Sequence, residues 1–279
     1  MKLQFAKMHG CGNDYIYFNC LEHELDDPNG LSIKLSDRHF SIGGDGIIMI
    51  CHSDVADAKM RMFNNDGSEG KMCGNAIRCV AKYLYDNKIV DKTDISIETL
   101  SGIKTIKCDV ENGKLKYATV NMGQAILMPE LIPVALDGDE IVNRSVMVNN
   151  NEYNITCVSM GNPHCVIFGG DPDLIDLEKI GPKFENAAIF PDRVNTEFAQ
   201  IIDDHTIKMR VWERGSGETL ACGTGACATA VAAVLCGHCK KGEDITINLT
   251  GGSLKINYTD ERVLMTGPAE LSFTGEVEV

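Results

Sequence analysis

Several features that mark other protein classes are missing from this chain of 279 residues. Its first residues lack the apolar run of a signal peptide, and no stretch is apolar over the ~20 residues that a membrane-spanning helix needs. Positive charge is scarce, because 26 lysine and arginine residues face 40 acidic ones and leave a formal net charge of −14. Nucleic acids and anionic membranes are bound by basic faces, so neither is expected as a partner. We expect a cytoplasmic protein that acts on a small molecule.

The sequence also lacks the cysteine pattern of a disulfide framework or a zinc site. Its 12 cysteines are scattered singly through a long chain, so most are expected to be reduced and buried. The one Cys-x-x-Cys motif, Cys236–Cys239, has no second pair to complete a zinc site, and we predict no metal. It follows a helical pattern, whereas a thioredoxin-like motif begins a helix. A thiol redox protein using Cys236 and Cys239 is nevertheless one alternative function.

Two cysteines, Cys73 and Cys222, stand in matched surroundings. Each follows a strand-like run, a turn rich in glycine and serine, and a glutamate, and each is followed at once by an apolar helical pattern. Each thiol is therefore expected at the start of a helix. Unpaired N–H groups and the positive end of the helix dipole gather there, and both favour the thiolate over the thiol.

The match extends over a large part of the chain. At a shift of 149 residues, Gly12-Asn13 falls on Gly161-Asn162, Lys59-Met60-Arg61 falls on Lys208-Met209-Arg210, and Cys73-Gly74 falls on Cys222-Gly223. Short alternating strands precede and follow one strong helical pattern in each half, Gly74–Tyr85 and Thr224–Leu235. We predict an α+β protein of two homologous domains related by an approximate two-fold axis.

A pair of equivalent cysteines suits one kind of chemistry. If the two halves face each other, their thiols approach one substrate carbon from opposite sides, so one can remove a proton while the other delivers one. This inverts the carbon, as in two-base racemisation or epimerisation. The N–H groups at the two helix starts, Gly74 and Asn75 on one side and Gly223 and Thr224 on the other, can bind the substrate carboxylate and stabilise the carbanion.

Other polar residues at equivalent positions suit an amino-acid substrate. Asn13 and Asn162 occupy equivalent turns, Asn64 and Glu213 equivalent strand ends, and Gly46 and Asn195 a further pair. Arg214 can clamp a second carboxylate in a fork geometry. Each residue also has a simpler interpretation: asparagine in a turn serves the backbone, Arg214 can pair with a surface acid, and His164 can be a core histidine.

These motifs resemble those of diaminopimelate epimerase. The resemblance covers essentially the whole chain and rests on Asn64-x-Asp66-Gly67-Ser68-Glu69, Cys73-Gly74-Asn75-Ala76, Gly161-Asn162-Pro163-His164 and the run from Glu213 to Gly225. It implies an isomerase that needs no cofactor, pyridoxal phosphate included, and interconverts LL- and meso-2,6-diaminopimelate, in lysine and peptidoglycan biosynthesis. It implies that Cys73 is the base towards the LL isomer and Cys222 the acid, with His164 and Glu213 supporting catalysis. The substrate would be held by Asn13, Asn64, Asn162, Asn195 and Arg214.

The resemblance also implies a fold. Each domain is expected to be a bent mixed β-sheet rolled around a central helix, with the last strand, Ala269–Val279, returning to the first domain. We therefore place the N-terminal domain at residues 1–121 plus 268–279 and the C-terminal domain at 122–267. A homodimer is expected. Some relatives carry glutamine at the position of Gly46, so a substrate contact there is in question.

Two further alternatives remain open from the sequence. Proline or hydroxyproline racemase shares the expected fold and also uses two cysteines, although Glu213-Arg214 and the four asparagines favour a substrate with a second charged end. A non-catalytic metabolite-binding module would need neither cysteine, and retention of both argues against it.

Overall fold

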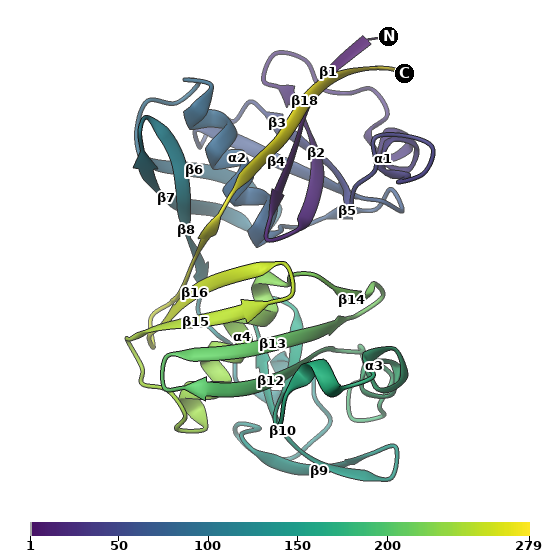
Figure 1. Ribbon diagram of the computed structural model, residues 1–279, viewed down its shortest axis with the longest axis vertical. Coiled ribbons are helices and arrows are strands. Elements are labelled where there is room, and N and C mark those ends of the chain that lie inside the picture. Colours follow the sequence, from purple (N-terminus) through teal and green to yellow (C-terminus); the bar gives the residue numbers. More distant parts are fainter. Residues whose placement is uncertain (1) are drawn as a thin grey trace. The chain divides into compact units, whose positions relative to one another are not determined.

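The computed structural model describes residues 2–279, which divide into two compact units (Figure 1). Unit 1 comprises Met1–Asn121 and Thr266–Val279, and unit 2 comprises Met122–Met265. The division after residue 121 coincides with the sequence-based boundary, whereas the second division falls after residue 265 rather than 267. None of the helices in the described residues combines the length and apolar character that a membrane-spanning helix needs.

Unit 1 is built from strands around a single long helix. Its elements are β1 (Lys2–Gly10), β2 (Asn13–Cys20), α1 (Pro28–Ser36), β3 (Gly46–Cys51), β4 (Ala58–Asn64), β5 (Glu69–Gly70), α2 (Gly74–Asp86), β6 (Asp94–Thr99), β7 (Gly102–Glu111), β8 (Lys114–Gly123) and β18 (Glu270–Glu278). Strand β18 pairs antiparallel with β1, so both chain ends lie on this unit (Figure 1). The C-terminal strand thus returns to the first unit, as the family resemblance implied.

Unit 2 repeats this plan. Its elements are η1 (Pro129–Leu131), β9 (Arg144–Val148), β10 (Asn151–Ser159), β11 (Pro163–Phe168), η2 (Pro172–Leu174), α3 (Leu177–Glu185), β12 (Asn195–Asp203), β13 (Thr206–Glu213), β14 (Gly217–Thr219), α4 (Gly223–Leu235), β15 (Asp244–Leu249), β16 (Gly252–Tyr258) and β17 (Val263–Pro268). Strands β8 and β17 each contain one of the two unit boundaries.

The internal repeat predicted from the sequence is present in the topology. Helices α1 and α2 correspond to α3 and α4 at a shift of 149 residues, from residue 28 to 177 and from 74 to 223. In unit 1, β2 pairs parallel with β3 and β4 pairs parallel with β6; in unit 2, β11 pairs parallel with β12 and β13 pairs parallel with β15. The chain is an α+β protein whose two units share one fold.

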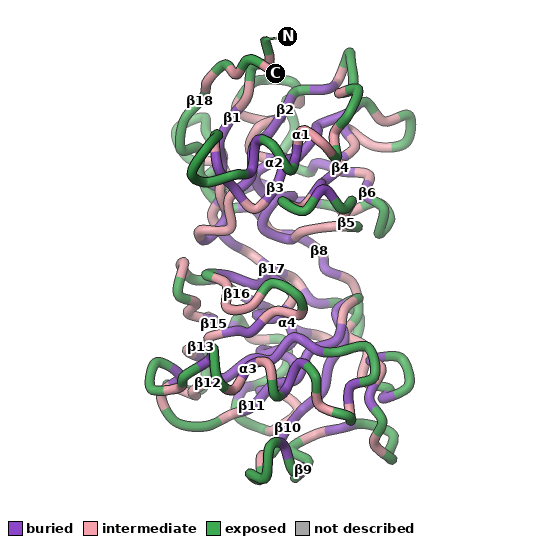
Figure 2. The backbone as a smooth tube through the Cα atoms, turned by 90° about the vertical axis from the view of Figure 1, so that its right-hand side faces the viewer, coloured by how far each residue is buried: buried purple, intermediate pink, exposed green. Residues whose placement is uncertain are grey.

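Most residues of the long helix in each unit are buried. Ten of the thirteen residues of α4 are buried, and most of them are alanine, cysteine, glycine or valine. A helix that is apolar all round is stable only inside a core, and these small side chains let the strands approach it closely. Figure 2 shows buried segments running through the middle of each unit while loops remain exposed. The first residue of this helix is therefore fixed by the core around it.

Local capping chemistry sets the boundaries of the two shorter helices. Helix α1 begins at Pro28 because Asp27 caps it, accepting a 3.0 Å hydrogen bond from Gly30 N. It ends at Ser36 because the Asp37 side chain accepts from His39 N and Phe40 N and starts a turn. Similarly, α3 begins at Leu177 after the cap Asp176, whose side chain accepts from Lys179 N.

Candidate active site

Cys73 and Cys222 are the N-cap residues of α2 and α4. Both have extended backbone, with φ of −131° at Cys73 and −113° at Cys222. The Sγ atom of Cys73 accepts from Ala76 N at 3.5 Å, and that of Cys222 accepts from Gly225 N at 3.4 Å. Serine, threonine and aspartate are the usual caps, so cysteine at both positions is not explained by helix stability. The predicted placement at two equivalent helix starts is confirmed.

In unit 1, Cys73 is half-buried and contacts Asn13. Its thiol donates to the Asn13 Oδ1 atom over 3.3 Å, and the other end of that amide, Nδ2, donates to Asp45 Oδ2 over 2.7 Å. Asn13 comes from the start of β2 and Asp45 from the loop before β3. Two segments separated in sequence are thereby joined at the cap of α2.

The other predicted residues of unit 1 differ in accessibility. Gly74 begins α2, but the Asn75 side chain turns inward, is 2% exposed and accepts from the buried Arg78 at 3.0 Å. Only the main chain of Asn75 is therefore available as the predicted carboxylate ligand. Asn64, the last residue of β4, is partly buried and donates from Nδ2 to Ser68 Oγ at 3.0 Å.

Gly46 lies where no side chain fits. Its φ is +154°, and a Cβ atom there would lie 2.0 Å from the Phe63 carbonyl oxygen. Gly46 is paired with Asn64 across β3 and β4, so the approach of the two strands requires the glycine. The glutamine that some relatives are expected to carry at this position would therefore clash with Phe63 in this backbone.

In unit 2, Cys222 is only 5% exposed, and its electrostatic surroundings oppose ionisation. Burial raises the pKa of its thiol well above the usual value, and the nearby carboxylates of Glu213 and Glu197 raise it further. Hydrogen bonds from Thr224 and Gly225 N act in the other direction but are outweighed. The expectation that the helix start favours a thiolate is therefore wrong for Cys222, because desolvation and like charge exceed the effect of the helix terminus.

Glu213, at the end of β13, is a second buried group with a raised pKa. Burial raises its pKa above the usual value, although hydrogen bonds from Thr219 and Cys222 partly oppose this. Its Oε1 atom accepts from the Thr219 hydroxyl across the β13–β14 hairpin. Glu213 and Cys222 therefore form a buried pair in which burial raises the pKa of both groups.

A second buried chain of contacts leads from the interior to Cys222. His164 Nδ1 lies 2.6 Å from Glu197 Oε1, and both side chains are fully buried. His164 Nε2 lies 3.1 Å from Asn162 Oδ1, and Asn162 Nδ2 donates to Thr224 Oγ1 at 3.3 Å. Thr224 Oγ1 lies 3.4 Å from Cys222 Sγ. The structure thus brings four predicted residues together within unit 2.

Glu197 was not among the predicted site residues. It lies in β12, two positions after Asn195, with a carboxylate that is fully buried and an Oε2 atom that has no hydrogen-bond partner. A Cβ atom on Gly225 would lie 2.7 Å from its Oε1 atom, so the helix start needs a glycine there. Glu197 is the one charged residue in the strand-like run 194–201, and this was the signal that could have identified it.

Asn195, the first residue of β12, is hydrogen-bonded to Arg214, which directly follows Glu213 at the end of β13. Asn195 is 4% exposed; its Oδ1 accepts from Arg214 N at 2.8 Å and its Nδ2 donates to the Pro163 carbonyl at 3.1 Å. The Arg214 guanidinium donates to the Asp192 carbonyl oxygen at 2.8 Å. The buried Glu185 fixes the following loop by accepting from Gly215 N at 3.0 Å. The loop that follows β13 is thereby bound to Asn195 of β12 and Glu185 of α3.

The raised pKa of Cys222 predicts how this thiol reacts. In the folded protein we expect iodoacetamide to label Cys222 slowly until the pH is well above 9.0, whereas in urea the same thiol reacts as an ordinary cysteine. In Glu213→Gln the folded profile moves to lower pH, because one of the charges that raise the Cys222 pKa is removed. Labelling at graded pH followed by peptide mass spectrometry measures both effects. Equal labelling of folded and unfolded Cys222 at pH 8 would contradict the prediction.

The same shift contributes to stability in a defined pH range. The unfolded chain loses the Cys222 proton near pH ~8.5, whereas the folded chain keeps it to higher pH. The contribution of this thiol to the free energy of unfolding is therefore fully present below that pH and is lost as the pH rises towards the folded value. Urea unfolding between pH 7 and 10 should show this decline, and Cys222→Ala should reduce it.

Other candidate sites in the described residues are separate from the two cysteines. Across residues 2–279, no group of three histidine, cysteine, aspartate or glutamate side chains is placed to hold a metal ion. Cys236, at the C-cap of α4, has its Sγ atom 3.3 Å from Thr156 Oγ1, and Cys239 is a free, buried thiol. The Cys-x-x-Cys motif thus lies at the opposite end of the helix from Cys222.

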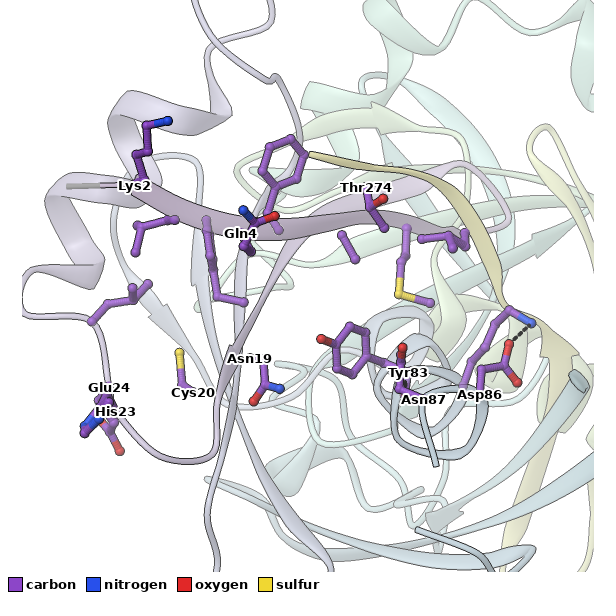
Figure 3. A pocket seen from close by; sticks show the side chains of 18 residues that line it. Lys2, Gln4, Asn19, Cys20, His23, Glu24, Tyr83, Asp86, Asn87 and Thr274 are labelled. Atoms are coloured by element: carbon purple, nitrogen blue, oxygen red, sulfur yellow. Dashed lines mark hydrogen bonds and ion pairs between the residues drawn. The ribbon is translucent and has the colours of Figure 1, made fainter. Parts of the chain in front are cut away.

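A cavity of about 520 Å³ in unit 1 is also distinct from the predicted site (Figure 3). It is lined by β1, β2, β18 and the last turns of α2, including Tyr83 and Asp86, and by none of the predicted site residues. At 1.5 Å per residue, the end of α2 lies about 18 Å from its start. The cavity is therefore remote from Cys73.

Comparison with known proteins agrees with this geometry. The family model for diaminopimelate epimerase matches residues 5–128 and 156–272. The chain is 52% identical to a diaminopimelate epimerase of Methanococcus maripaludis (strain C5), over 99% of this chain and 100% of that one, and 49% identical to one of Bacillus cereus, over 99% and 98%.

Among solved structures, a hydroxyproline epimerase from Agrobacterium vitis superposes with a TM-score of 0.73 and covers 99% of this chain and 92% of that one, at 12% sequence identity. That likeness shows a shared fold alone. The family model and relatives with about half of their residues in common over the full length are far more specific. They show that this chain, with its two helix-capping cysteines, belongs to the diaminopimelate epimerase family.

Proposed function

We propose that this chain interconverts LL- and meso-2,6-diaminopimelate without a cofactor, with Cys73 and Cys222 as the two acid–base groups. The family membership supports the epimerase activity and the substrate. The observation that carries the assignment of the cysteines is their identical place, as N-caps of the equivalent helices α2 and α4. Such an activity makes the chain an isomerase of lysine and peptidoglycan precursor biosynthesis.

The two thiols are suited to complementary steps. Cys222, a buried thiol with a raised pKa, is a proton donor at neutral pH, and the partly exposed Cys73 is the base that removes the α-proton. In the reverse direction the roles exchange, so Cys222 must then lose its proton. Glu213 lies beside Cys222, accepts its hydrogen bond and has a pKa above the usual value, which makes it the natural acceptor of that proton. His164 lies within hydrogen-bond distance of Glu197 and Asn162 and so provides a buried polar side chain close to this site.

The helix starts supply the charge stabilisation that the reaction needs. Removing an α-proton leaves negative charge that spreads into the adjacent carboxylate. N–H groups of Gly74 and Asn75 in unit 1, and of Gly223 and Thr224 in unit 2, begin the two helices and are aligned with the helix dipole. Donors of this kind contribute most when they face charge that develops in the transition state.

The distal end of the substrate carries a second amino-acid group that is not inverted. We assign its recognition to Asn64, Asn195 and Arg214, together with Asn13 and Asn162 in the equivalent turns. Arg214 has one guanidinium nitrogen bound to a main-chain carbonyl, and its other donors can form a fork with a carboxylate. A substrate with a charged group at both ends fits this set better than proline does.

Isotope incorporation tests the two-base mechanism. When LL-diaminopimelate is incubated in deuterated water with no added cofactor, we expect deuterium in the meso product but not in the recovered LL substrate at early times. The reason is that one thiol removes the proton while a different, solvent-exchanged thiol delivers deuterium on the other face. Nuclear magnetic resonance of the separated isomers at less than about a tenth of conversion measures both.

Early label in recovered substrate at the same level as in product would indicate a single exchanging base and refute the mechanism. Proline and 4-hydroxyproline serve as control substrates in the same solvent, and we expect no exchange with either. Exchange into proline alone would replace the proposed function with that of a racemase.

The proposal extends to the oligomeric state and the cellular location of the chain. The family resemblance implies a homodimer, and light scattering of the purified chain measures the oligomeric state. The cytoplasmic location is proposed from the sequence pattern. Neither the chemistry at Cys73 nor that at Cys222 requires a group from a second copy, because every contact described above lies within one unit.

A further inference from the structure

The side-chain amide of Asn13 is held at both ends. Its Oδ1 atom accepts from the Cys73 thiol over 3.3 Å, and its Nδ2 atom donates to Asp45 Oδ2 over 2.7 Å. A carboxylate can only accept hydrogen bonds, so the amide end that faces Asp45 must be the NH2 group. The end that faces Cys73 is consequently the carbonyl oxygen.

Asp45 itself is fixed by several donors. Its Oδ2 atom also accepts from Asp14 N at 3.1 Å, and its Oδ1 atom accepts from Arg38 Nη2 at 2.9 Å. Arg38 in turn binds both carboxylate oxygens of Asp14, at 2.6 and 3.2 Å, and Lys7 Nζ lies 2.7 Å from Asp14. This network leaves Asp45 little freedom to turn away from Asn13.

The equivalent asparagine of unit 2 is arranged differently. Asp45 corresponds to Val194 at the shift of 149 residues, so no carboxylate faces Asn162 from that position. The Asn162 oxygen lies beside His164 Nε2, and its NH2 group is directed to Thr224, which contacts Cys222. The two amides therefore present opposite ends towards the two cysteines.

We propose that Asp45 is a positioning residue that orients the Asn13 amide so that Cys73 faces a carbonyl oxygen and is held as a thiol when no substrate is bound. An acceptor beside the sulfur stabilises S–H and disfavours S−, whereas an NH2 group would do the reverse. A thiolate formed against this carbonyl is the stronger base, which is what removal of a weakly acidic α-proton requires. This role in catalysis rests on the proposed function, whereas the effect on the thiol does not.

The proposal is tested on the free enzyme by labelling Cys73 with iodoacetamide between pH 6 and 10, followed by peptide mass spectrometry. In Asp45→Ala the amide is released and can turn its NH2 group towards the sulfur. We expect the midpoint of the Cys73 profile to fall by roughly one pH unit, so that labelling at pH 7 is about tenfold faster. Asn13→Ala, which removes the acceptor and leaves the ion cluster intact, should lower the midpoint in the same direction.

A second variant distinguishes the loss of a negative charge from the loss of the Asn13 amide orientation. Asp14→Asn removes a carboxylate from the same cluster, but that carboxylate makes no contact with the Asn13 side chain, so we expect less than a third of the shift. In the Asn13→Ala background, Asp45→Ala should have no further effect on the midpoint. Equal shifts in Asp45→Ala and Asp14→Asn, or an undiminished effect of Asp45→Ala without Asn13, would overturn the proposal, as would an unchanged profile.

Two further measurements keep the test decisive. Thermal unfolding shows whether Asp45→Ala is folded, and if it is not, Asn13→Ala alone decides whether the carbonyl facing the sulfur controls Cys73. The epimerisation rate is measured in parallel, and kcat is expected to fall in Asp45→Ala. Absence of epimerisation by the unmodified enzyme would refute the proposed function while leaving the labelling result intact.

Discussion

Serine at either Cys73 or Cys222 is expected to lower the rate of diaminopimelate epimerisation by at least ~10²–10⁴-fold, the usual contribution of a positioned acid or base. A hydroxyl is a far weaker acid than a thiol, so it neither delivers a proton readily nor exists as an oxyanion at neutral pH. Because the two-base mechanism needs both groups in every turnover, each single variant should show the full loss. Initial rates in both directions measure it.

These variants are unusually clean tests because serine suits the structure. Both cysteines cap helices, with their sulfur atoms accepting from Ala76 N and Gly225 N. Serine is among the preferred N-caps, so neither substitution should reduce the free energy of unfolding by more than about 1 kcal/mol. Loss of activity with an unchanged urea midpoint therefore identifies a chemical role.

A third cysteine provides the control. Cys236 caps the other end of α4 and contacts Thr156. We expect Cys236→Ser to keep near-normal activity, which also rejects a redox function for the Cys236–Cys239 motif. A Cys73→Ser or Cys222→Ser enzyme that turned over near the normal rate would refute the two-base mechanism.

Placing a side chain at Gly46 is expected to produce the largest loss of stability. A Cβ atom would lie 2.0 Å from the Phe63 carbonyl oxygen, and the φ of +154° is one that side-chain-bearing residues rarely adopt. Steric overpacking and backbone strain each cost about 1–3 kcal/mol. Gly46→Ala and Gly46→Gln should therefore lower the free energy of unfolding by about 3 kcal/mol or more, measured by urea unfolding.

Gly102 offers a matched control that measures the free-energy cost of backbone strain without a steric clash. Its φ is +89°, but no atom lies within 4 Å of the position of an added Cβ. Gly102→Ala should therefore cost only the strain of a left-handed conformation, about 1–2 kcal/mol. If Gly46→Gln were as stable as the unmodified chain, strands β3 and β4 could separate to admit the side chain, and the contact that glutamine makes in some relatives would become possible here.

Much of the fold followed from local patterns. The apolar helical runs after Cys73 and Cys222 predicted α2 and α4, because helix periodicity and a preceding turn are properties of adjacent residues. The shift of 149 residues predicted that the two halves share one topology, since equal sequence patterns fold alike. The short strands β5 and β14 were not predicted, because two or three residues become a strand only by pairing with β4 and β13.

The sequence by itself determined the two equivalent cysteines, their place at helix starts and the resemblance that named the reaction. Only the tertiary structure decided how each thiol is surrounded. Cys222 is buried beside Glu213 and Glu197, which come from β13 and β12, and these contacts reverse the expected preference for a thiolate. Asp45 is linked to Cys73 by the side chain of Asn13, which precedes Asp45 by 32 residues and is hydrogen-bonded to both. Capping depends on neighbours in sequence, whereas desolvation and charge depend on whatever the fold brings within a few ångströms.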